Sequence, residues 1–375
     1  MLSLIRSEAA FIVGAVTTVI LMTVGAPWFY RLDNPLILIG LFVWVFVVMV
    51  RCAFGVVRHA DSLAELLGEP YGTLILTISV IGIEVSVIAA LMLNGNAEPT
   101  LARDTMLAVV IIVMNGMVGL SLLVGGFRHK EQEYNLQGAR AFLGVLLTLA
   151  TVSLILPNFT TSTPDGSLTP LQSILFASMT LALYATFLGL QTTRHRAYFD
   201  QPTAAAAGSG APGEDDHKKH HDLEVRSVPY HAVFLILTLL PIVLLSKKLA
   251  ALIDFGLDAF SLPHALGGVL VAILVLTPEG VAALKAAALN HLQRSVNICL
   301  GSALATISLT VPAVVAIGLL TGTHVELGLE GTEMVLLILT LTLSILTFGA
   351  TRTNMLQGAV HLVVFFVYFV LIFDP

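Results

Sequence analysis

GTLILTISVIGIEVSVIAALML at residues 72–93 and GGVLVAILVLTPEGVAAL at residues 267–284 are two apolar runs that each contain one glutamate. The glutamates, Glu84 and Glu279, each stand twelve residues after the glycine that opens the run. Each run has about the length that an α-helix needs to cross a bilayer. A carboxylate near the bilayer centre costs about 2.5 to 3.5 kcal/mol, so it is rarely placed there without a cation, a proton or a partner. Two such glutamates in matching contexts predict one shared ion site.

The whole chain has the composition of a polytopic membrane protein, since 57% of its 375 residues are hydrophobic and only 11% are charged. We expect an all-α fold with about eleven transmembrane helices. The first apolar stretch is long and has Pro27 directly after a possible cleavage point, which favours a retained helix over a signal peptide. The predicted spans cover residues 9–30, 35–57, 72–94, 105–126, 138–157, 170–192, 228–249, 263–288, 296–321, 332–350 and 355–373.

The basic residues predict the orientation of the chain in the membrane. If each span crosses once, most of the 18 Lys and Arg residues fall on the side of the N-terminus. The opposite side carries Arg31, Arg103, Lys247 and Lys248. By the positive-inside rule, the N-terminus is cytoplasmic and the C-terminus is external.

The chain divides into two halves around a polar segment at residues 193–227, which we expect to be a disordered cytoplasmic linker. Acidic and histidine residues near the centre of this linker form a candidate loose cation or pH site, and a solvated linker without a site is the alternative. Aligning the two glutamate runs makes residues 34–192 and 228–375 two five-helix repeats, with residues 1–33 as an extra N-terminal helix. The odd number of helices inverts the second repeat, so both carboxylates reach the membrane midplane.

Oxygen-bearing residues surround the two glutamates. Pro278 lacks an N–H and would free a carbonyl one turn earlier, while Gly82 relaxes the equivalent place in the first half, so we expect a break in each glutamate helix. Carboxylate, carbonyl, hydroxyl and amide oxygens suit Ca²⁺ or Na⁺. The alternative for each hydroxyl is a bond to its own helix backbone. The alternative for each of the two glutamates is a carboxyl group that stays protonated and hydrogen-bonded. The candidate coordination shell consists of Thr77, Ser79, Asn115, Thr277, Pro278, Ser302 and Thr306.

Three segments carry a resemblance to a known family: LGEPYGTLILTISVIGIEVSVIAALM, LTPEGVAALKAAALNHLQRSVNICLGSALATISLTVPAVV and TRTNMLQGAVHL. They resemble the bacterial calcium/sodium:proton antiporters of the Ca²⁺/cation exchanger superfamily, and the likeness covers nearly the whole chain. The resemblance implies a multi-pass protein of the bacterial inner membrane whose ion-binding acids are Glu84 and Glu279. It also implies transport of Ca²⁺, Na⁺ or K⁺ and protons, with no cofactor. The repeats read IGIE and LTPE, where eukaryotic calcium/proton exchangers resemble GNxxE, so the amide beside each acid is missing.

The expected function is exchange of cytoplasmic cations for external protons at the two-glutamate site. A cation stabilises the ionised carboxylate, whereas a carboxyl in apolar surroundings holds a proton, so the two ions displace each other. Rocking of one half against the other would then expose the site to each side in turn. An intramembrane hydrolase is one alternative, but HExxH and GxSxG motifs are missing from the sequence. A passive cation channel is another. The expected partners are membrane lipid and the transported ions, with no nucleic acid.

Overall fold

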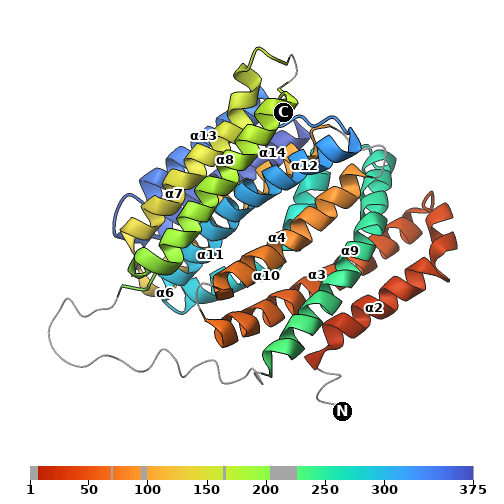
Figure 1. Ribbon diagram of the computed structural model, residues 1–375, viewed down its shortest axis with the longest axis horizontal. Helices are drawn as coiled ribbons and strands as arrows, with labels where there is room; N and C mark the ends of the chain where they lie inside the picture. The colour runs from red at the N-terminus through yellow and green to blue at the C-terminus, as the bar shows by residue number, and fades with distance from the viewer. Residues whose placement is uncertain (1–6, 69–70, 94–98, 164–165, 203–225, 375) are drawn as a thin grey trace.

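The computed structural model describes residues 7–68, 71–93, 99–163, 166–202 and 226–374, and these are mainly helical (Figure 1). The helices lie side by side as an elongated bundle, and the start of α2 and the end of α14 lie at opposite ends (Figure 1). Most of the linker, residues 203–225, lies outside the described residues, and so do its acidic and histidine residues. The main helices are α2 (Ala9–Met22), α3 (Pro35–Leu67), α4 (Tyr71–Met92), α5 (Leu101–Ile111), α6 (Val118–His129), α7 (Leu136–Ala150), α8 (Pro170–Gly189), α9 (Val228–Ala259), α10 (Ala265–Ala288), α11 (Leu292–Ala305), α12 (Val311–Thr321), α13 (Gly331–Thr347) and α14 (Met355–Phe373).

The predicted eleven-helix membrane architecture is confirmed. Among the described residues, nine helices are long and apolar enough to cross a membrane, and Ala9–Met22 and Gly331–Thr347 are shorter apolar helices. The α5–α6 and α11–α12 pairs each form one span, as Leu101–His129 and Leu292–Thr321. The helices α3 and α9 continue about ten residues past their predicted ends. Their last turns are more polar, so hydropathy alone did not detect them.

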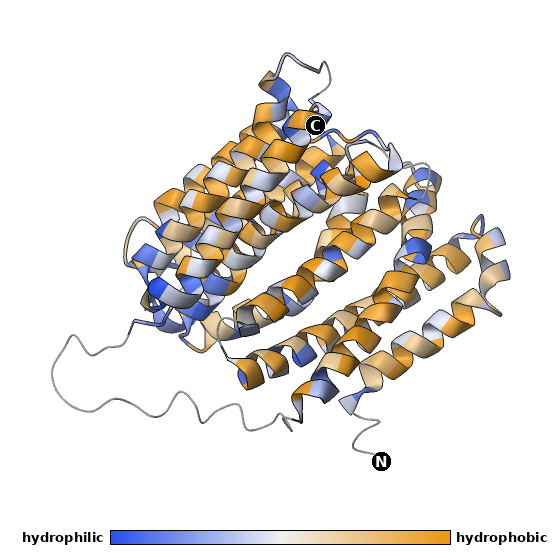
Figure 2. Ribbon diagram, in the orientation of Figure 1, coloured by the Kyte–Doolittle hydropathy of each residue, from blue (hydrophilic) through white to orange (hydrophobic). Residues whose placement is uncertain are grey.

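The two glutamate helices, α4 and α10, lie between two apolar cores. Within the described residues, one core is built mainly from α5 to α8 and α11 to α14, and the other from α2, α3 and α9. Each of α4 and α10 contributes to both: Ile88 and Leu276 to the first core, Val87 and Leu274 to the second. Apolar residues cover the helices along their length, and polar residues gather toward their ends (Figure 2). The glutamates are therefore held where two separately packed bodies meet.

Continuous helices replace the predicted breaks at the glutamates. Both α4 and α10 run without interruption through Gly82 and Pro278, so the predicted breaks are wrong. A proline within a helix removes one backbone hydrogen bond, which a membrane helix tolerates when its neighbours hold it in place. The spans beside the glutamates carry π-helical segments instead, η2 (Ile112–Met117) and η8 (Thr306–Thr310). Two further π-helical segments, η3 (Thr151–Ile155) and η5 (Leu190–Arg194), follow α7 and α8. Segments η2 and η8 occupy corresponding places in the two halves, and π-helical turns are frequent at functional sites.

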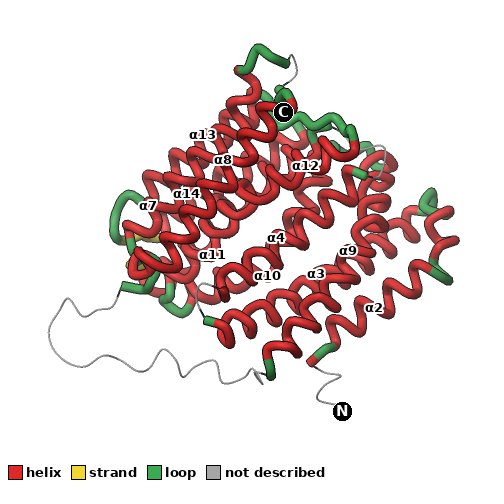
Figure 3. The backbone as a smooth tube through the Cα atoms, viewed as in Figure 1, coloured by secondary structure: helices red, strands yellow, loops and turns green. Residues whose placement is uncertain are grey.

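A two-stranded sheet joins the two halves at the linker end of the bundle, which is the end where residues 193–227 connect α8 to α9. Strand β1 (Glu131–Glu133) pairs antiparallel with β2 (Arg352–Asn354), seen in yellow in Figure 3. The Arg352 guanidinium donates to Glu133 across the pair. Each strand leads into a helix capped by an asparagine, Asn135 before α7 and Asn354 before α14.

Glycines bring α6 and α14 into close contact beside this sheet. A Cβ atom at Gly358 would lie 2.6 Å from the Leu123 nitrogen and 2.7 Å from the Gly119 oxygen, and one at Gly126 would lie 2.5 Å from the Met355 nitrogen. These neighbours are backbone atoms, so they cannot rotate away. Small residues of this kind let membrane helices approach closely.

Candidate cation site

Glu84 is buried in the middle of α4 and bonded to two hydroxyl groups of a distant helix. Only 1% of its surface is exposed. Its Oε2 accepts from Thr306 Oγ1 at 2.9 Å, and its Oε1 accepts from Thr310 Oγ1 at 3.0 Å. Both threonines belong to η8. The carboxyl group therefore has a hydroxyl partner on each oxygen.

Glu279 on α10 is bonded to the same span one turn earlier. Its Oε2 accepts from the hydroxyl of Ser302 on α11. Ser302, Thr306 and Thr310 are spaced four residues apart, so they lie on one helix face. We call these three residues the hydroxyl stripe. It contacts both glutamates and brings the two halves of the chain together at one place.

A cavity of about 460 Å³ leads toward this site from the linker end of the bundle. Asp61, Arg196, Asp200 and Arg294 line its outer part, where α3, α8 and α11 end or begin, and Glu279 lines its inner part together with Pro278 and Ser302. Glu84 is not among the lining residues and lies behind the hydroxyl stripe. Ions arriving from the linker end would therefore meet Glu279 first.

The predicted shell residues other than Ser302 and Thr306 have other places in the structure. Thr77 and Pro278 line the cavity. The hydroxyls of Ser79 and Thr277 donate to the carbonyls of Ile75 and Ile273, four residues earlier in their own helices. This is the common behaviour of hydroxyls inside membrane helices.

Asn115 lies in η2, but its amide is used in a second buried network. Its Nδ2 donates to Thr340 Oγ1 at 2.8 Å, and its Oδ1 lies 3.0 Å from Nδ1 of His361. This assignment makes His361 Nδ1 the donor, so His361 Nε2 accepts from Thr347 Oγ1 at 2.9 Å. The bonds tie η2 to α13 and α14. Asn115 thus shapes the span opposite η8, with both ends of its amide engaged away from the glutamates.

Thr310 is the site residue that sequence reasoning missed. It stands four residues after Thr306, which itself follows Ser302 by four. That spacing was visible in the sequence, and extending the stripe by one more turn would have found Thr310. Among the described residues, no group of three or more His, Cys, Asp or Glu side chains is arranged to hold a metal ion. The candidate cation site therefore consists of two carboxylates with hydroxyl oxygens, a set that favours hard cations over thiolate-binding metals.

Two inverted halves, with a pair of buried acids between them, define the fold of a secondary cation exchanger, and comparison with known proteins places the chain more closely. The family model described as sodium/calcium exchanger protein matches residues 37–193 and 230–373. The chain belongs to this family.

Among curated relatives, the chain is 42% identical over 321 residues to the sodium-potassium/proton antiporter ChaA of Escherichia coli (strain K12), covering 86% of this chain and 85% of that protein. It is also 42% identical over 319 residues to the putative ionic transporter y4hA of Sinorhizobium fredii, covering 85% and 84%. The fold is similar to the solved structure of native YfkE, with a TM-score of 0.70 at 19% identity, covering 98% of this chain and 100% of that one. The protein is therefore a multi-pass membrane transporter, and the hydrolase alternative is excluded.

Proposed function

We propose that the protein exchanges cytoplasmic Ca²⁺, Na⁺ or K⁺ for external protons at one site formed by Glu84 and Glu279. The observation that supports this most is the shared hydroxyl stripe. Ser302 bonds to one glutamate, and Thr306 and Thr310 bond to the other. Both carboxyl groups thus belong to one site, although they are 195 positions apart in the sequence.

The chemistry of the site favours competition between protons and cations. Two protonated carboxyls are neutral and fit their apolar surroundings, whereas two carboxylates need positive charge beside them. A hydroxyl group is both donor and acceptor, so each hydroxyl of the stripe can donate to a carboxylate or turn its lone pairs toward a cation. One divalent cation or two monovalent cations would balance the two carboxylates.

The cation itself is a matter for experiment. The relative in Escherichia coli is named for sodium and potassium, and a Bacillus subtilis relative, 25% identical over 244 residues, is named a Ca²⁺/H⁺ antiporter. Oxygen ligands of the kind found here accept all three ions. We propose Ca²⁺ as the main substrate, with Na⁺ and K⁺ as the alternatives to be ranked.

Alternating access would come from the two separately packed bodies. The cavity reaches Glu279 from the linker end, which the distribution of Lys and Arg residues assigns to the cytoplasm. Movement of the body formed by α2, α3 and α9 against the rest would close this cavity and open the opposite side. The surrounding lipid supports both bodies.

The function is tested with purified protein in liposomes that enclose a pH-sensitive dye and an acidic interior. Adding Ca²⁺, Na⁺ or K⁺ outside is expected to make the interior more alkaline, because each entering cation releases protons from the site. N-methylglucamine, which is too large for the site, serves as the control. Cation flux of equal size without any proton movement would instead show a passive channel.

Replacing threonine hydroxyls of the stripe is expected to weaken cation binding without abolishing exchange. Thr306→Val or Thr310→Val removes one oxygen and one hydrogen bond to Glu84 at nearly constant volume. A hydrogen bond to a charged group contributes about 1.5 to 3 kcal/mol, which corresponds to a rise of about tenfold or more in the half-saturating cation concentration. The dye assay measures this value.

Ser308→Ala is the matched control for the threonine variants. Ser308 lies in the same π-helical segment, but its hydroxyl donates to the carbonyl of Leu304. It should leave the half-saturating concentration unchanged. An equal shift in all three variants would mean that the stripe acts only through helix packing.

A further inference from the structure

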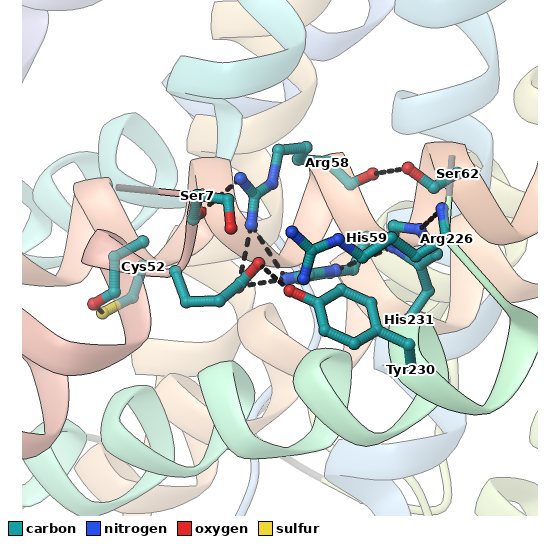
Figure 4. Close-up of polar contacts among 10 residues, drawn as sticks. Ser7, Cys52, Arg58, His59, Ser62, Arg226, Tyr230 and His231 are labelled. Carbon is teal, nitrogen blue, oxygen red and sulfur yellow. Dashed lines mark hydrogen bonds and ion pairs between the residues drawn. The ribbon is translucent and has the colours of Figure 1, made fainter. Parts of the chain in front are cut away.

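A second buried polar cluster lies at the linker end of the bundle, where α2, α3 and α9 meet (Figure 4). Its titratable members are Glu8, His59 and His231, which are 4%, 1% and 5% exposed. Tyr230 and His231 reach His59 from α9, as Figure 4 shows. This cluster is separate from the two transport glutamates, and the proposed exchange mechanism does not use it.

The contacts in the cluster form a continuous chain from the end of the linker to the start of α2. The backbone N–H of Arg226 lies 3.2 Å from His231 Nε2. His231 Nδ1 lies 3.1 Å from His59 Nδ1, and His59 Nε2 lies 3.0 Å from Glu8 Oε2. The hydroxyl of Tyr230 donates to the other oxygen of Glu8.

The fixed donor at Arg226 sets the proton positions along this chain, because the other fixed donor, Arg58 Nη2, donates to Glu8 Oε2. The N–H of Arg226 can only donate, so His231 Nε2 must accept and the proton of His231 is on Nδ1. That proton is donated to His59 Nδ1, which must therefore be unprotonated. The proton of His59 is then on Nε2 and is donated to Glu8. Both imidazoles are neutral, and all four ring nitrogens are engaged.

An added proton has no place in this arrangement without breaking a bond. Protonating His231 at Nε2 turns two donors, this group and the Arg226 N–H, toward each other. Protonating His59 at Nδ1 likewise turns two donors toward each other, this group and the Nδ1–H of His231. The cluster is thus complete only while both imidazoles are neutral, and imidazoles ordinarily change charge near neutral pH.

The charges around the two imidazoles also oppose the binding of an added proton. The imidazoles face Arg58 on α3 and Arg226 ahead of α9, and Glu8 is the negative group among them. Arg58 Nη2 and His59 Nε2 both donate to Glu8 Oε2, at 2.9 and 3.0 Å, and lie 3.0 Å apart as two donors to one oxygen. The single carboxylate therefore already has a cationic partner. Burial would raise the pKa of the Glu8 carboxyl, but the hydrogen bond from Tyr230 and the charge of Arg58 outweigh it, so the pKa is lowered. Glu8 therefore stays ionised while the imidazoles titrate.

Helix α3 connects this cluster to the transport cavity. His59 faces α2 and α9, whereas Val57 and Asp61, two residues to either side, line the cavity. A change in how α2 and α9 hold α3 would therefore move a wall of the cavity.

We propose that His59 and His231 form a proton-sensing site that holds α2 and the end of the linker on the α3–α9 pair when neutral and releases them when protonated. The site lies on the side that the proposed orientation places in the cytoplasm. Acidification of that side would loosen the α2–α3 contact and change the shape of the cavity. The inference goes beyond the proposed exchange, because the ligand is a proton that is bound and not transported.

Cys52 is a natural reporter of this release. It is fully buried between α2 and α3, with its Sγ 3.4 Å from the carbonyl of Ala10, and a Cβ at Gly14 would lie 2.5 Å from it. Cys299 is equally buried, in α11. Maleimide labelling of both thiols can be followed by mass spectrometry on the detergent-solubilised protein at pH 7.5 and pH 4.5. The lower value lies well below the ordinary imidazole pKa of about 6.5, because Arg58 and Arg226 face the buried imidazoles and oppose their protonation. Labelling of the urea-unfolded protein at each pH corrects for the reactivity of the thiol itself.

The corrected labelling of Cys52 is expected to rise several-fold at pH 4.5, while that of Cys299 stays constant. The double variant His59→Gln, His231→Gln should keep Cys52 protected at both pH values, because glutamine offers one donor and one acceptor but does not titrate. His291→Gln is the matched control, since His291 is an exposed histidine at the same end of the bundle, and it should behave like the wild type. Size-exclusion chromatography checks that each variant is folded.

Two outcomes would overturn the proposal: constant labelling of Cys52 in the wild type, or an equal rise in the double glutamine variant. The labelling needs no transport, so its result is independent of the proposed function. In liposomes, acidifying the linker side should change the exchange rate of the wild type more than that of the double variant, because proton competition at the two glutamates affects both proteins but only the wild type has the histidine pair.

Discussion

Glu84→Gln and Glu279→Gln are each expected to abolish cation-driven proton movement. Glutamine has nearly the same shape and can still bond to the hydroxyl stripe, but it neither ionises nor releases a proton. A cation at the site would then face one carboxylate, with part of its charge unbalanced in apolar surroundings. Removing one partner of a buried charge pair costs about 3 to 5 kcal/mol, which corresponds to about two to four orders of magnitude in binding. The dye-loaded liposomes measure the loss directly.

Glu65→Gln is the matched control for these variants. Glu65 is an exposed glutamate near the end of α3, so its loss should leave the exchange rate unchanged. Normal exchange in either the Glu84 or the Glu279 variant would contradict the two-glutamate site. A variant that binds the cation but moves no protons would show that the two carboxyls have separate roles.

Gly358→Ala is expected to lower the stability of the protein clearly, because the added methyl group meets backbone atoms. The new Cβ would meet the backbone of α6 at 2.6 and 2.7 Å, so α14 would have to move away from α6. Overpacking of this kind costs about 1 to 3 kcal/mol, and more when only backbone can yield. A lower unfolding temperature in detergent and a smaller yield of monodisperse protein are the expected results.

Gly144→Ala tests the same substitution where space is open. A Cβ at Gly144 has no atom within 4 Å, and the residue lies inside α7. Alanine favours a helix over glycine by about 1 kcal/mol, so this variant should be as stable as the wild type or more so. If Gly358→Ala were equally harmless, the contact between α6 and α14 would be looser than the structure shows.

The membrane fold could be predicted from the sequence because the bilayer imposes a length on every apolar helix. Glu84 and Glu279 were visible for the same reason, since a charged residue is rare in such a run. The end of α3 at Leu67 was not visible, because its last turns are polar and leave the hydropathy pattern. The break at Pro278 was wrong, because proline lowers helix propensity locally while packing on both faces of α10 keeps the helix intact.

Contacts between residues that are far apart in the sequence could not be predicted from the sequence. The alignment of the two glutamate runs pairs Asn115 with Thr306 in the sequence, and each residue lies in a π-helical segment of its half. It did not reveal that the amide of Asn115 is bonded to His361, because the two residues are 246 positions apart. The cluster of Glu8, His59 and His231 was missed in the same way. Local patterns show which residues are costly to bury, whereas tertiary packing determines their partners. The coordination of the cation by the proposed residues remains a prediction for the variants to test.

The sheet between β1 and β2 has a consequence for how the chain is assembled. Residues 131–133 leave the ribosome long before residues 352–354. The glycine face of α6 likewise has no packing partner until α14, the last helix of the chain, has been synthesised. The first half therefore enters the membrane with an unpaired strand and an uncovered helix face. Its assembly is completed only when synthesis reaches the final span. A ribosome that stops before residue 350 would leave a chain that contains both glutamates but lacks this closure, and membrane quality-control proteases could recognise it by that exposed edge.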